Sequence, residues 1–599
     1  MSELDLTKAI AAHQAGELDK AEKFYLKQLK KTRDFRTKQL LGLLYSNQNK
    51  FELAERHMLG SLRMNPMQPN VQNNLAICYK KQAKLDKAVE YFGCAIALQP
   101  GYVDAYRNLA ATLVQQGRFR DSQEIAVIGL EANPDDAGLH NQLGVAKKEL
   151  GDHKGAIDCF KKALHINPNH TQSQHNLGVA YRLNNQPQLA LNCLERLLNE
   201  NSSFELLHNI ANAHSDLGHL ETAVEYYERV LTLAPEYPSA YQNLSNLTWS
   251  LGQRENFLDC YEQAFARGVV TEELVLSYLE ALLTSGQVDE AIAFLQTTSL
   301  DINDARRCDF LGRCHLEAGR ASEAISFHEQ ACSEPDAPNP YWVDFAITLM
   351  VADDIPRATR ILEQVYSSEP DNQMALAYLC ACWRLQQDPR DKLVNNYDLV
   401  GAYEIPVPDG FATIDEFNQY LNKYLTSVHT SKARPLEQSV RQGTQTQGNL
   451  FARDAKPLRL LEKSFRTVIN QYMNDMADLE PPYPGYNIPR EFEFSASWSV
   501  KLRQNGYHEI HIHPMGWISA CYYVDLPRVI DTTSEREGWI QFGEPNIELA
   551  TPLPAQHAIK PAAGTMALFP SYMWHGTVPF KSDEIRTTVV VDIVPVPGG

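Results

Sequence analysis

Three features are missing from this 599-residue sequence. Its 11 cysteines include no Cys-x-x-Cys pair, and no stretch approaches the roughly 18 apolar residues of a membrane span. The start, Met1–Ile10, lacks the basic and apolar regions of a signal peptide. These absences speak against a zinc ribbon, a transmembrane helix and secretion. Because unpaired cysteines are typical of reducing compartments, we expect a cytoplasmic protein.

Basic residues are also in short supply. The 55 Lys and Arg stand against 74 Asp and Glu, which gives a net charge of -19. Such a chain lacks the positive field on which binding to nucleic acid or anionic lipid depends, so we expect neither as a partner. The 44% apolar and 22% charged residues are typical of a folded globular protein. The length allows about four domains, and the sequence does not indicate an oligomeric state.

A turn residue recurs about every 34 residues through the first two thirds of the chain. The series is Gly16, Asn49, Ala83, Gly117, Gly151, Asn185, Gly218, Gly252, Gly286 and Gly319. Five positions after each stands a small residue, except at Phe257: Ala21, Ala54, Ala88, Ser122, Ala156, Ala190, Ala223, Ala291 and Ala324. Prolines that end helices close several units, at Pro66, Pro100, Pro134, Pro168 and Pro235. This pattern predicts stacked helix–turn–helix units.

These units resemble the tetratricopeptide repeat, most clearly at Gly101–Pro134 and Asp135–Pro168. We expect an α-solenoid, a tetratricopeptide superhelix of about eleven repeats, over residues 1–371. A capping helix at Asn372–Lys392 and a linker should fill residues 372–394.

An amide recurs in the first helix of six units, at Asn74, Asn108, Gln142, Asn176, Asn209 and Asn243. The resemblance implies that this position faces the concave surface, where such rows hold extended peptides in the related O-linked GlcNAc transferases. Each hydrogen bond would contribute only about 0.5–1.5 kcal/mol, so the row would act as a set. We expect a protein or peptide partner in this groove. The alternative is that these residues suit the helix start and are solvated.

The repeat stops at Asn395. Pro-rich patches (Ile405–Gly410, Glu480–Pro489) and a polar stretch (Ser427–Asn449) interrupt two amphipathic helices, expected at Thr413–Thr426 and Pro457–Met476. Apolar residues then alternate from Phe492 to Leu502, which predicts a half-buried strand, followed by a turn at Asn505-Gly506. Further strands are expected at Tyr507–His513, Ile518–Asp525, Gly538–Phe542, Thr565–Phe569 and Ile585–Val594. The pattern predicts a jelly-roll domain with flanking helices over residues 395–599.

The densest group of possible metal ligands is the segment HEIHIHP, which begins at His508. In a strand, Glu509, His511 and His513 point to one face and His508 to the other. Two imidazoles on one face can converge on one ion, so a third ligand must come from elsewhere in the sequence.

Two later segments complete the set. His575 follows a predicted strand and enters a turn, and Arg586 lies eleven residues further on. Thr588 shares a strand face with Arg586. A fixed guanidinium beside a hydroxyl suits the recognition of a carboxylate.

This arrangement resembles the double-stranded β-helix oxygenases that use Fe(II) and 2-oxoglutarate. More narrowly, four segments look like an uncharacterised bacterial branch of that group: GTQTQGN (443–449), HIHP (511–514), SACYYV (519–524) and FPSYMWH (569–575). The resemblance implies His511 and His575 as iron ligands. It also implies that Arg586, aided by Thr588, binds the distal carboxylate of 2-oxoglutarate.

One position departs from the family. The acid that normally follows the first histidine by two residues is replaced here by His513. The third ligand is therefore His513, which we favour, or Glu509, or the site binds another metal. Three neutral ligands leave the ion more positive, which bears on whether 2-oxoglutarate is used.

The sequence thus favours an Fe(II)- and 2-oxoglutarate-dependent hydroxylase that acts on a protein or peptide side chain presented by the solenoid. The catalytic residues would be His511, His513, His575 and Arg586. The alternatives are a non-catalytic peptide-binding scaffold and a three-His iron dioxygenase that does not use 2-oxoglutarate. A histidine-rich strand without metal or a structural zinc site would explain the segment less fully. A cupin is also less favoured, because Pro514–Ser519 lacks the acid of the usual cupin motif.

Overall fold

The computed structural model describes residues 2–32, 34–297, 303–333, 336–436, 438–477, 479, 491–532 and 534–596. The expected Pro-rich patch Glu480–Pro489 lies outside them. The chain folds into two compact units, Met1–Glu200 and Asn201–Gly599. No helix among the described residues is both long enough and apolar enough to span a membrane.

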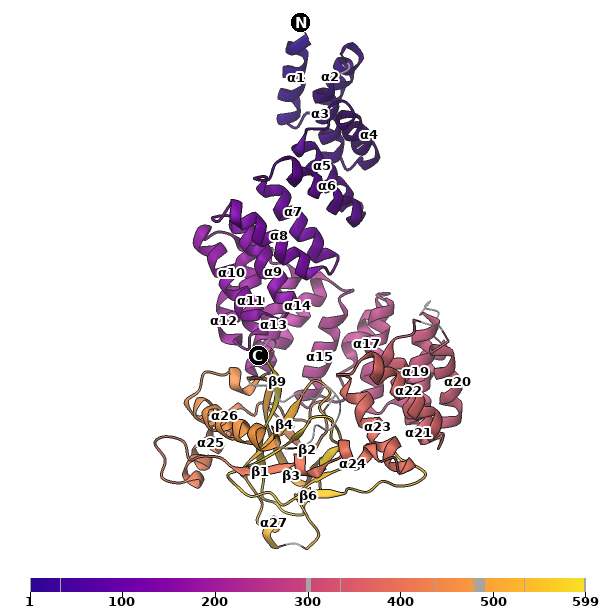
Figure 1. The fold of residues 1–599 in the computed structure, drawn as a ribbon, viewed down its shortest axis with the longest axis vertical. Coiled ribbons are helices and arrows are strands. Elements are labelled where there is room, and N and C mark those ends of the chain that lie inside the picture. The colour runs from indigo at the N-terminus through magenta and orange to yellow at the C-terminus, as the bar shows by residue number, and fades with distance from the viewer. Residues whose placement is uncertain are drawn as a thin grey trace. The chain divides into compact units, whose positions relative to one another are not determined.

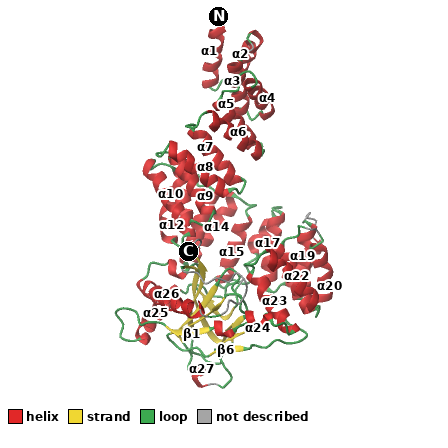
Figure 2. Cartoon of the chain, viewed as in Figure 1, coloured by secondary structure: helices red, strands yellow, loops and turns green. Residues whose placement is uncertain are grey.

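The first unit consists of stacked helix pairs (Figures 1 and 2). Its helices are α1 (Ser2–Gln14), α2 (Leu18–Lys31), α3 (Phe35–Asn47), α4 (Phe51–Leu62), α5 (Pro69–Lys81), α6 (Leu85–Leu98), α7 (Val103–Gln115), α8 (Phe119–Ala132), α9 (Ala137–Glu149), α10 (His153–Ile166), α11 (Thr171–Leu183) and α12 (Pro187–Leu194), followed by the 3-10 helix η1 (Glu195–Leu197).

The second unit begins with further pairs of the same kind. These are α13 (Phe204–Leu217), α14 (Leu220–Leu233), α15 (Pro238–Ser250), α16 (Asp259–Ala266), α17 (Glu272–Ser285), α18 (Val288–Thr297), α19 (Asp304–Glu317), α20 (Ala321–Ala331), α21 (Asn339–Val351) and α22 (Ile355–Ser368). After them come α23 (Gln373–Gln386), α24 (Arg390–Val394) and the 3-10 helix η2 (Tyr397–Leu399).

The turn residues that define the repeat all have left-handed backbone. From Gly16 to Gly319 their φ angles lie between 55 and 86°, and Asp353 continues the series at 65°. The small residues five positions later, from Ala21 to Ala324, are completely buried. These residues let two helices cross closely, because a larger side chain would hold them apart. The predicted helix–turn–helix register is confirmed.

Phe257, the one departure from the small-residue rule, changes its repeat. Its ring is buried edge-on against Trp249, with centroids 5.1 Å apart. The second helix of this pair, α16, begins only at Asp259 and has 8 residues. Because a phenyl ring does not fit the close crossing that alanine allows, this helix forms only beyond it.

The expected helix Asn372–Lys392 is broken in two. Asn372 caps α23 by accepting a hydrogen bond from the backbone N–H of Ala375. Gln387 then adopts a left-handed conformation (φ 55°) ahead of Pro389, so α23 ends at Gln386. Ten of the 14 residues of α23 are buried, including every residue from Ala375 to Trp383, as expected of a helix segment that is covered on all sides.

The rest of the chain forms a roll of two antiparallel sheets with helices against one of them (Figure 1). Its elements are β1 (Gly401–Glu404), α25 (Ile414–Val428), β2 (Val440–Gln445), η3 (Leu450–Ala452), α26 (Lys456–Ala477), β3 (Phe492–His508), β4 (Ile518–Asp525), α27 (Val529–Thr532), β5 (Ile540–Phe542), β6 (His557–Ile559), β7 (Thr565–Pro570), β8 (His575–Thr577) and β9 (Arg586–Pro595). The larger sheet has the order β1-β7-β4-β9-β3-β2 and the smaller one β6-β5-β8. The predicted fold class, a tetratricopeptide solenoid with a C-terminal jelly roll, is confirmed.

Two details of the predicted strands are wrong. Asn505 and Gly506 do not form a hairpin turn, because β3 continues to His508 through a bulge opposite Gln442 of β2. Asn505 supplies the left-handed residue of that bulge (φ 58°). Residues 509–513 are not a regular strand either. Their main contact with the smaller sheet is a single bridge between His511 and His575.

The two faces of the larger sheet have different neighbours. On β4, Tyr522 packs against the helices: its hydroxyl donates to Asn418 Oδ1 of α25 at 2.6 Å, and its ring meets Phe465 of α26. Cys521 and Tyr523 point to the opposite face, into the roll. The same alternation along β9 directs Arg586 into the roll. The helices therefore cover one face, and the interior of the roll is left for a site.

Within the second unit, the last helices of the solenoid support the roll directly. The Trp574 indole donates to the Ala377 carbonyl of α23 at 3.0 Å, and the Tyr572 hydroxyl donates to the Val394 carbonyl at 2.8 Å. On another side, the Trp249 indole at the end of α15 donates to the Arg434 carbonyl at 2.8 Å. Trp574 immediately precedes His575, so the solenoid helps to fix one of the predicted ligands.

A partly buried histidine outside the predicted site should make the roll sensitive to acid. His429 lies between the hydroxyls of Thr444 and Ser499, at 3.0 and 3.1 Å. Burial, with Lys501 and Arg453 nearby, lowers its pKa to about 3. Since the unfolded histidine takes up a proton below about pH 6.5, this residue's contribution to stability is present above that pH and is lost as the pH falls towards 3.

We therefore expect the Tm of the wild-type protein to fall more steeply between pH 7.5 and pH 5 than that of a His429→Gln variant. Thermal melts at the two pH values, followed by circular dichroism, measure the difference. Parallel slopes for the two proteins would show that His429 is protonated without cost in the folded state.

Candidate metal centre

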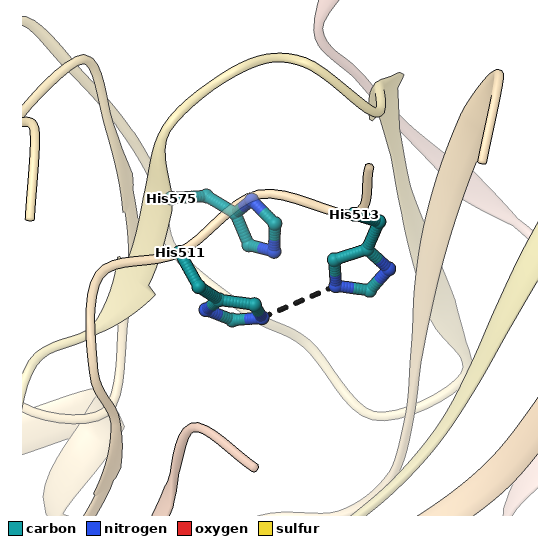
Figure 3. Close-up of side chains that lie close together, drawn as sticks. All are labelled: His511, His513 and His575. Carbon is teal, nitrogen blue, oxygen red and sulfur yellow. Dashed lines mark hydrogen bonds between the residues drawn. The ribbon is translucent and has the colours of Figure 1, made fainter. Parts of the chain in front are cut away.

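Three imidazoles converge inside the roll. His511 and His513 come from the segment after β3, and His575 begins β8 (Figure 3). One ring nitrogen of each lies within 4.8 Å of the others. Backbone hydrogen bonds in both directions, at 2.9 and 3.0 Å, hold His511 beside His575. The structure therefore brings together the three histidines that the sequence predicts.

Each of the three rings has an acceptor for its Nδ1–H. His511 Nδ1 lies 2.7 Å from the Glu509 carbonyl oxygen, and His575 Nδ1 lies 3.0 Å from that of Met573. His513 Nδ1 lies 2.5 Å from Asp592 Oδ1. Hydrogen bonds of this kind fix the tautomer, leaving a lone pair on each Nε2.

Those lone pairs face one another. The Nε2 atoms of His511 and His513 are only 3.1 Å apart, as the dashed line in Figure 3 marks. Two ligand nitrogens at right angles, each about 2.1 Å from one ion, have a separation of about 3 Å. Without a cation the contact is repulsive, because both nitrogens are acceptors. The arrangement therefore fits a bound metal ion.

The surroundings keep His511 and His575 neutral. Burial, together with the nearby His513, lowers the pKa of His511 to about 3. Burial also holds the pKa of His575 well below its ordinary value. Neutral imidazole is the form that binds a metal.

The predicted alternation between His508 and Glu509 is wrong. Glu509, expected beside His511 and His513, instead pairs with Arg441, and its side chain is 44% exposed. His508, expected on the other face, lines the same hollow and stacks near His511 with centroids 5.9 Å apart. The two side chains do not alternate as in a strand, because β3 ends at His508 and Glu509 lies beyond it. Glu509 is thus placed outside the cluster and His513 inside it.

Arg586 lies in the same hollow, and no charged side chain among the described residues forms an ion pair with it. The hollow has a volume of about 360 Å³, and the three histidines and Arg586 line it. The Arg586 side chain is 1% exposed, and its Nε and Nη1 atoms have no hydrogen-bond partner among the described residues. Its guanidinium lies over the Tyr523 ring, 5.3 Å from the centroid. A buried cation of this kind is costly unless an anion joins it.

Thr588, predicted to help Arg586 bind a carboxylate, does not line the hollow. It lies on the same strand as Arg586, completely buried, and its hydroxyl has no hydrogen-bond partner within the described part of the chain. Tyr522, Tyr523 and Trp574 are core residues, whereas Trp498 and Phe569 line the hollow.

A second hollow of about 330 Å³ adjoins the first. Gln438, Gln445, Ala496 and Trp498 line both, and the rest of the second hollow is mostly amides and hydroxyls, including Gln447 and Asn449. These amides belong to the GTQTQGN segment. The metal centre therefore opens towards a neutral, polar surface.

In the first unit, three residues of the predicted amide row share a groove. Asn74, Asn108 and Gln142 line a hollow of about 520 Å³ with Tyr102 and Arg107. Part of the row is bonded between repeats: Asn108 donates to Asn73 at 3.2 Å, and Asn176 donates to Asn141 at 3.0 Å.

In the second unit, the last two amides of the row also have bonds within the protein. Asn209 donates to the Glu205 carbonyl at 2.9 Å, and Asn243 donates to Asn212 at 3.2 Å. These amides therefore have a structural role beside any role in binding.

Two residues near the centre escaped the sequence analysis. Asp592 accepts the hydrogen bond from His513, and Ser439 Oγ lies 3.3 Å from His511 Nε2. The alternation along β9 could have placed Asp592 on the same face as Arg586, six residues before it. Nothing in the local sequence marks Ser439.

Sequence models of known families match two parts of the chain. Residues 496–592 match the family described as "Putative 2OG-Fe(II) oxygenase". Tetratricopeptide-repeat models match residues 81–143, 137–170, 159–192 and 204–237. The chain thus combines tetratricopeptide repeats with a C-terminal oxygenase domain of that type. The comparison with curated proteins gives no match.

Solved structures with similarity to the chain include tetratricopeptide proteins. One from Parabacteroides merdae ATCC 43184 is 15% identical, with 41% of this chain and 98% of that chain covered and a TM-score of 0.35. Yeast Tom70 is 14% identical, with 66% and 98% covered and a TM-score of 0.36. A thermophilic protein from Thermus thermophilus is 19% identical, with 30% and 100% covered and a TM-score of 0.28.

Proposed function

We propose that this protein is an Fe(II)- and 2-oxoglutarate-dependent hydroxylase of a protein or peptide side chain. The observation that carries the proposal is the pairing, in one hollow, of three converging imidazoles with a buried guanidinium, two of whose nitrogens have no hydrogen-bond partner among the described residues. The imidazoles suit a divalent metal, and the guanidinium suits the far carboxylate of a dicarboxylic cosubstrate.

In this proposal His511, His513 and His575 hold Fe(II), and Arg586 binds the distal carboxylate of 2-oxoglutarate with Thr588 beside it. When bound, the iron and cosubstrate would supply the oxidising chemistry: one oxygen atom of O₂ enters the substrate C–H bond, and the other enters succinate as CO₂ leaves. The chain's own part is to orient both groups.

The substrate class rests on the solenoid and on the polar hollow. A free amino acid would not need residues 1–371 of repeats, which we assign to substrate presentation, nor a capping region at 372–394 that braces the roll domain at 395–599. The amides of the second hollow can hydrogen-bond a polypeptide backbone in either direction. We place the protein in the cytoplasm because its 11 cysteines are free thiols.

The proposal is tested by incubating the iron-loaded protein with 2-oxoglutarate, O₂ and a peptide library. Release of succinate coupled to the gain of one oxygen atom by a peptide supports it. Peptide binding without succinate in any screen would favour a scaffold. Oxygen uptake that ignores 2-oxoglutarate and survives Arg586→Ala would favour a three-His dioxygenase, an alternative suggested by the neutral ligand set.

The amide groove allows a prediction with a matched control. Asn74 and Gln142 line the groove, and their side chains form no hydrogen bond within the described part of the chain. Replacing both with alanine should therefore raise the KM for a peptide substrate about tenfold with kcat unchanged. The Tm should stay the same. Replacing Asn73 and Asn141, which bond to the next repeat, should lower the Tm instead. Equal loss of stability in both double variants would assign the whole row to structure.

A further inference from the structure

Sites of this kind normally have a negatively charged carboxylate as a metal ligand. Here a carboxylate, Asp592, lies behind a proposed ligand, His513, instead of binding the ion itself. We infer that Asp592 is a positioning residue that acts through His513, fixing its tautomer and compensating the charge of the bound ion. This inference rests on the proposed metal site. Asp592 Oδ1 lies 2.5 Å from His513 Nδ1, and the two residues are only 9% and 7% exposed.

The three imidazoles differ in the group that accepts the hydrogen bond from their Nδ1–H. His511 and His575 donate to neutral backbone carbonyls, of Glu509 and Met573. His513 donates to a carboxylate. It is also the residue that stands where related sites have an acidic ligand. The negative charge of Asp592 therefore lies behind His513, the imidazole that takes the place of the carboxylate ligand.

The carboxylate is held firmly in place. Ser519 Oγ donates to Asp592 Oδ1 at 2.8 Å and lies 2.8 Å from Ser571 Oγ. The backbone at Gly516 packs closely against this group, because a Cβ there would lie 2.5 Å from Ser571 Oγ and 3.5 Å from Asp592 Cγ. On the other side the Trp498 ring lies against His513, with centroids 5.6 Å apart. The pair is thus fixed by both β4 and β9.

This arrangement has two physical consequences. A carboxylate that accepts the Nδ1–H selects the tautomer in which Nε2 of the neutral His513 ring carries the lone pair, and it makes that nitrogen a better ligand. It also adds one negative charge near the ion, as a carboxylate ligand would. The set of three imidazoles and Asp592 therefore matches the net charge of two imidazoles and one carboxylate.

A double-mutant cycle on metal affinity tests the inference without turnover. Anaerobic titration of the metal-free protein with Co(II), read by visible absorption, gives a Kd for the wild type and for Asp592→Asn, His513→Asp and the double variant. In the wild-type background, Asp592→Asn should weaken Co(II) binding about 10- to 100-fold.

In the His513→Asp background, the same Asp592→Asn substitution should leave the Kd unchanged or tighten it. The introduced carboxylate would bind the ion directly, and the main effect of the Asp592 carboxylate would then be to repel that new carboxylate. An equal loss in both backgrounds would overturn the inference, because it would mean that Asp592 acts by packing or as a direct ligand. Wild-type protein that binds no Co(II) would instead count against the proposed function itself.

Two further measurements guard against misfolded variants. Ser519→Ala removes a bond to the same oxygen but keeps the charge, so it should change the Kd less than Asp592→Asn does; an equal loss would contradict the inference. In Zn(II)-loaded wild-type protein, the His513 Nδ1–H should give a strongly downfield proton resonance that is missing in His513→Asp. Its absence from the wild type would also contradict the inference.

Discussion

Replacement of Arg586 by methionine is expected to abolish the binding of 2-oxoglutarate and, at the same time, to stabilise the protein. The guanidinium is 1% exposed, and two of its nitrogens have no partner among the described residues. Removing an uncompensated buried charge should raise the free energy of unfolding by about 1–4 kcal/mol. Thermal melts with and without 2-oxoglutarate measure both effects.

The wild-type protein should respond to the cosubstrate in the opposite way. At a concentration 100 times its Kd, 2-oxoglutarate should stabilise the wild type by about 2.7 kcal/mol, whereas Arg586→Met should show no shift. Arg528→Met is the control, because Arg528 is exposed and paired with Glu584. If Arg586→Met loses stability and keeps the shift, the guanidinium has a structural role and the cosubstrate binds elsewhere.

The second large effect is expected from His575→Ala, which should lower the affinity for Fe(II) by at least about a hundredfold. His575 supplies one of three converging nitrogens, and two imidazoles alone form an incomplete site. Anaerobic dialysis followed by metal analysis gives the iron content. The control is His557→Ala, since His557 lies on β6 against Tyr397 and outside the cluster.

The melting curve of metal-free His575→Ala must accompany that measurement, because His575 is 5% exposed and its loss leaves a space in the roll. A folded His575→Ala variant that retains one iron per chain would show that other residues hold the ion.

The repeats could be predicted in detail because their information is local. A left-handed turn residue and a small residue five positions later recur in each unit, and Asp353 shows that the series extends one step beyond Gly319. The first part of β3, where apolar residues alternate, was predicted for the same reason. The strands β1, β6 and β8 were missed because three or four residues are too few to show an alternation, and His575 was expected in a turn. The strand β2 (VRQGTQ) was missed because it has one apolar side chain.

The centre was predicted only in part. The three histidines follow from spacing and resemblance, but the side of the chain taken by Glu509 depends on where β3 ends. The contact between His513 and Asp592 joins residues 79 positions apart, so it is set by the packing of β9 beside β4. The missing partner of Arg586 is likewise a property of the folded roll, as is the support that α23 gives to Trp574.

The most direct test is an anaerobic titration of the purified protein with Fe(II) and then with 2-oxoglutarate, followed by visible absorption. We expect a weak band that requires both additions and saturates at one equivalent of iron per chain. Protein that takes up no iron, or that binds iron and shows no band with 2-oxoglutarate, would contradict the account.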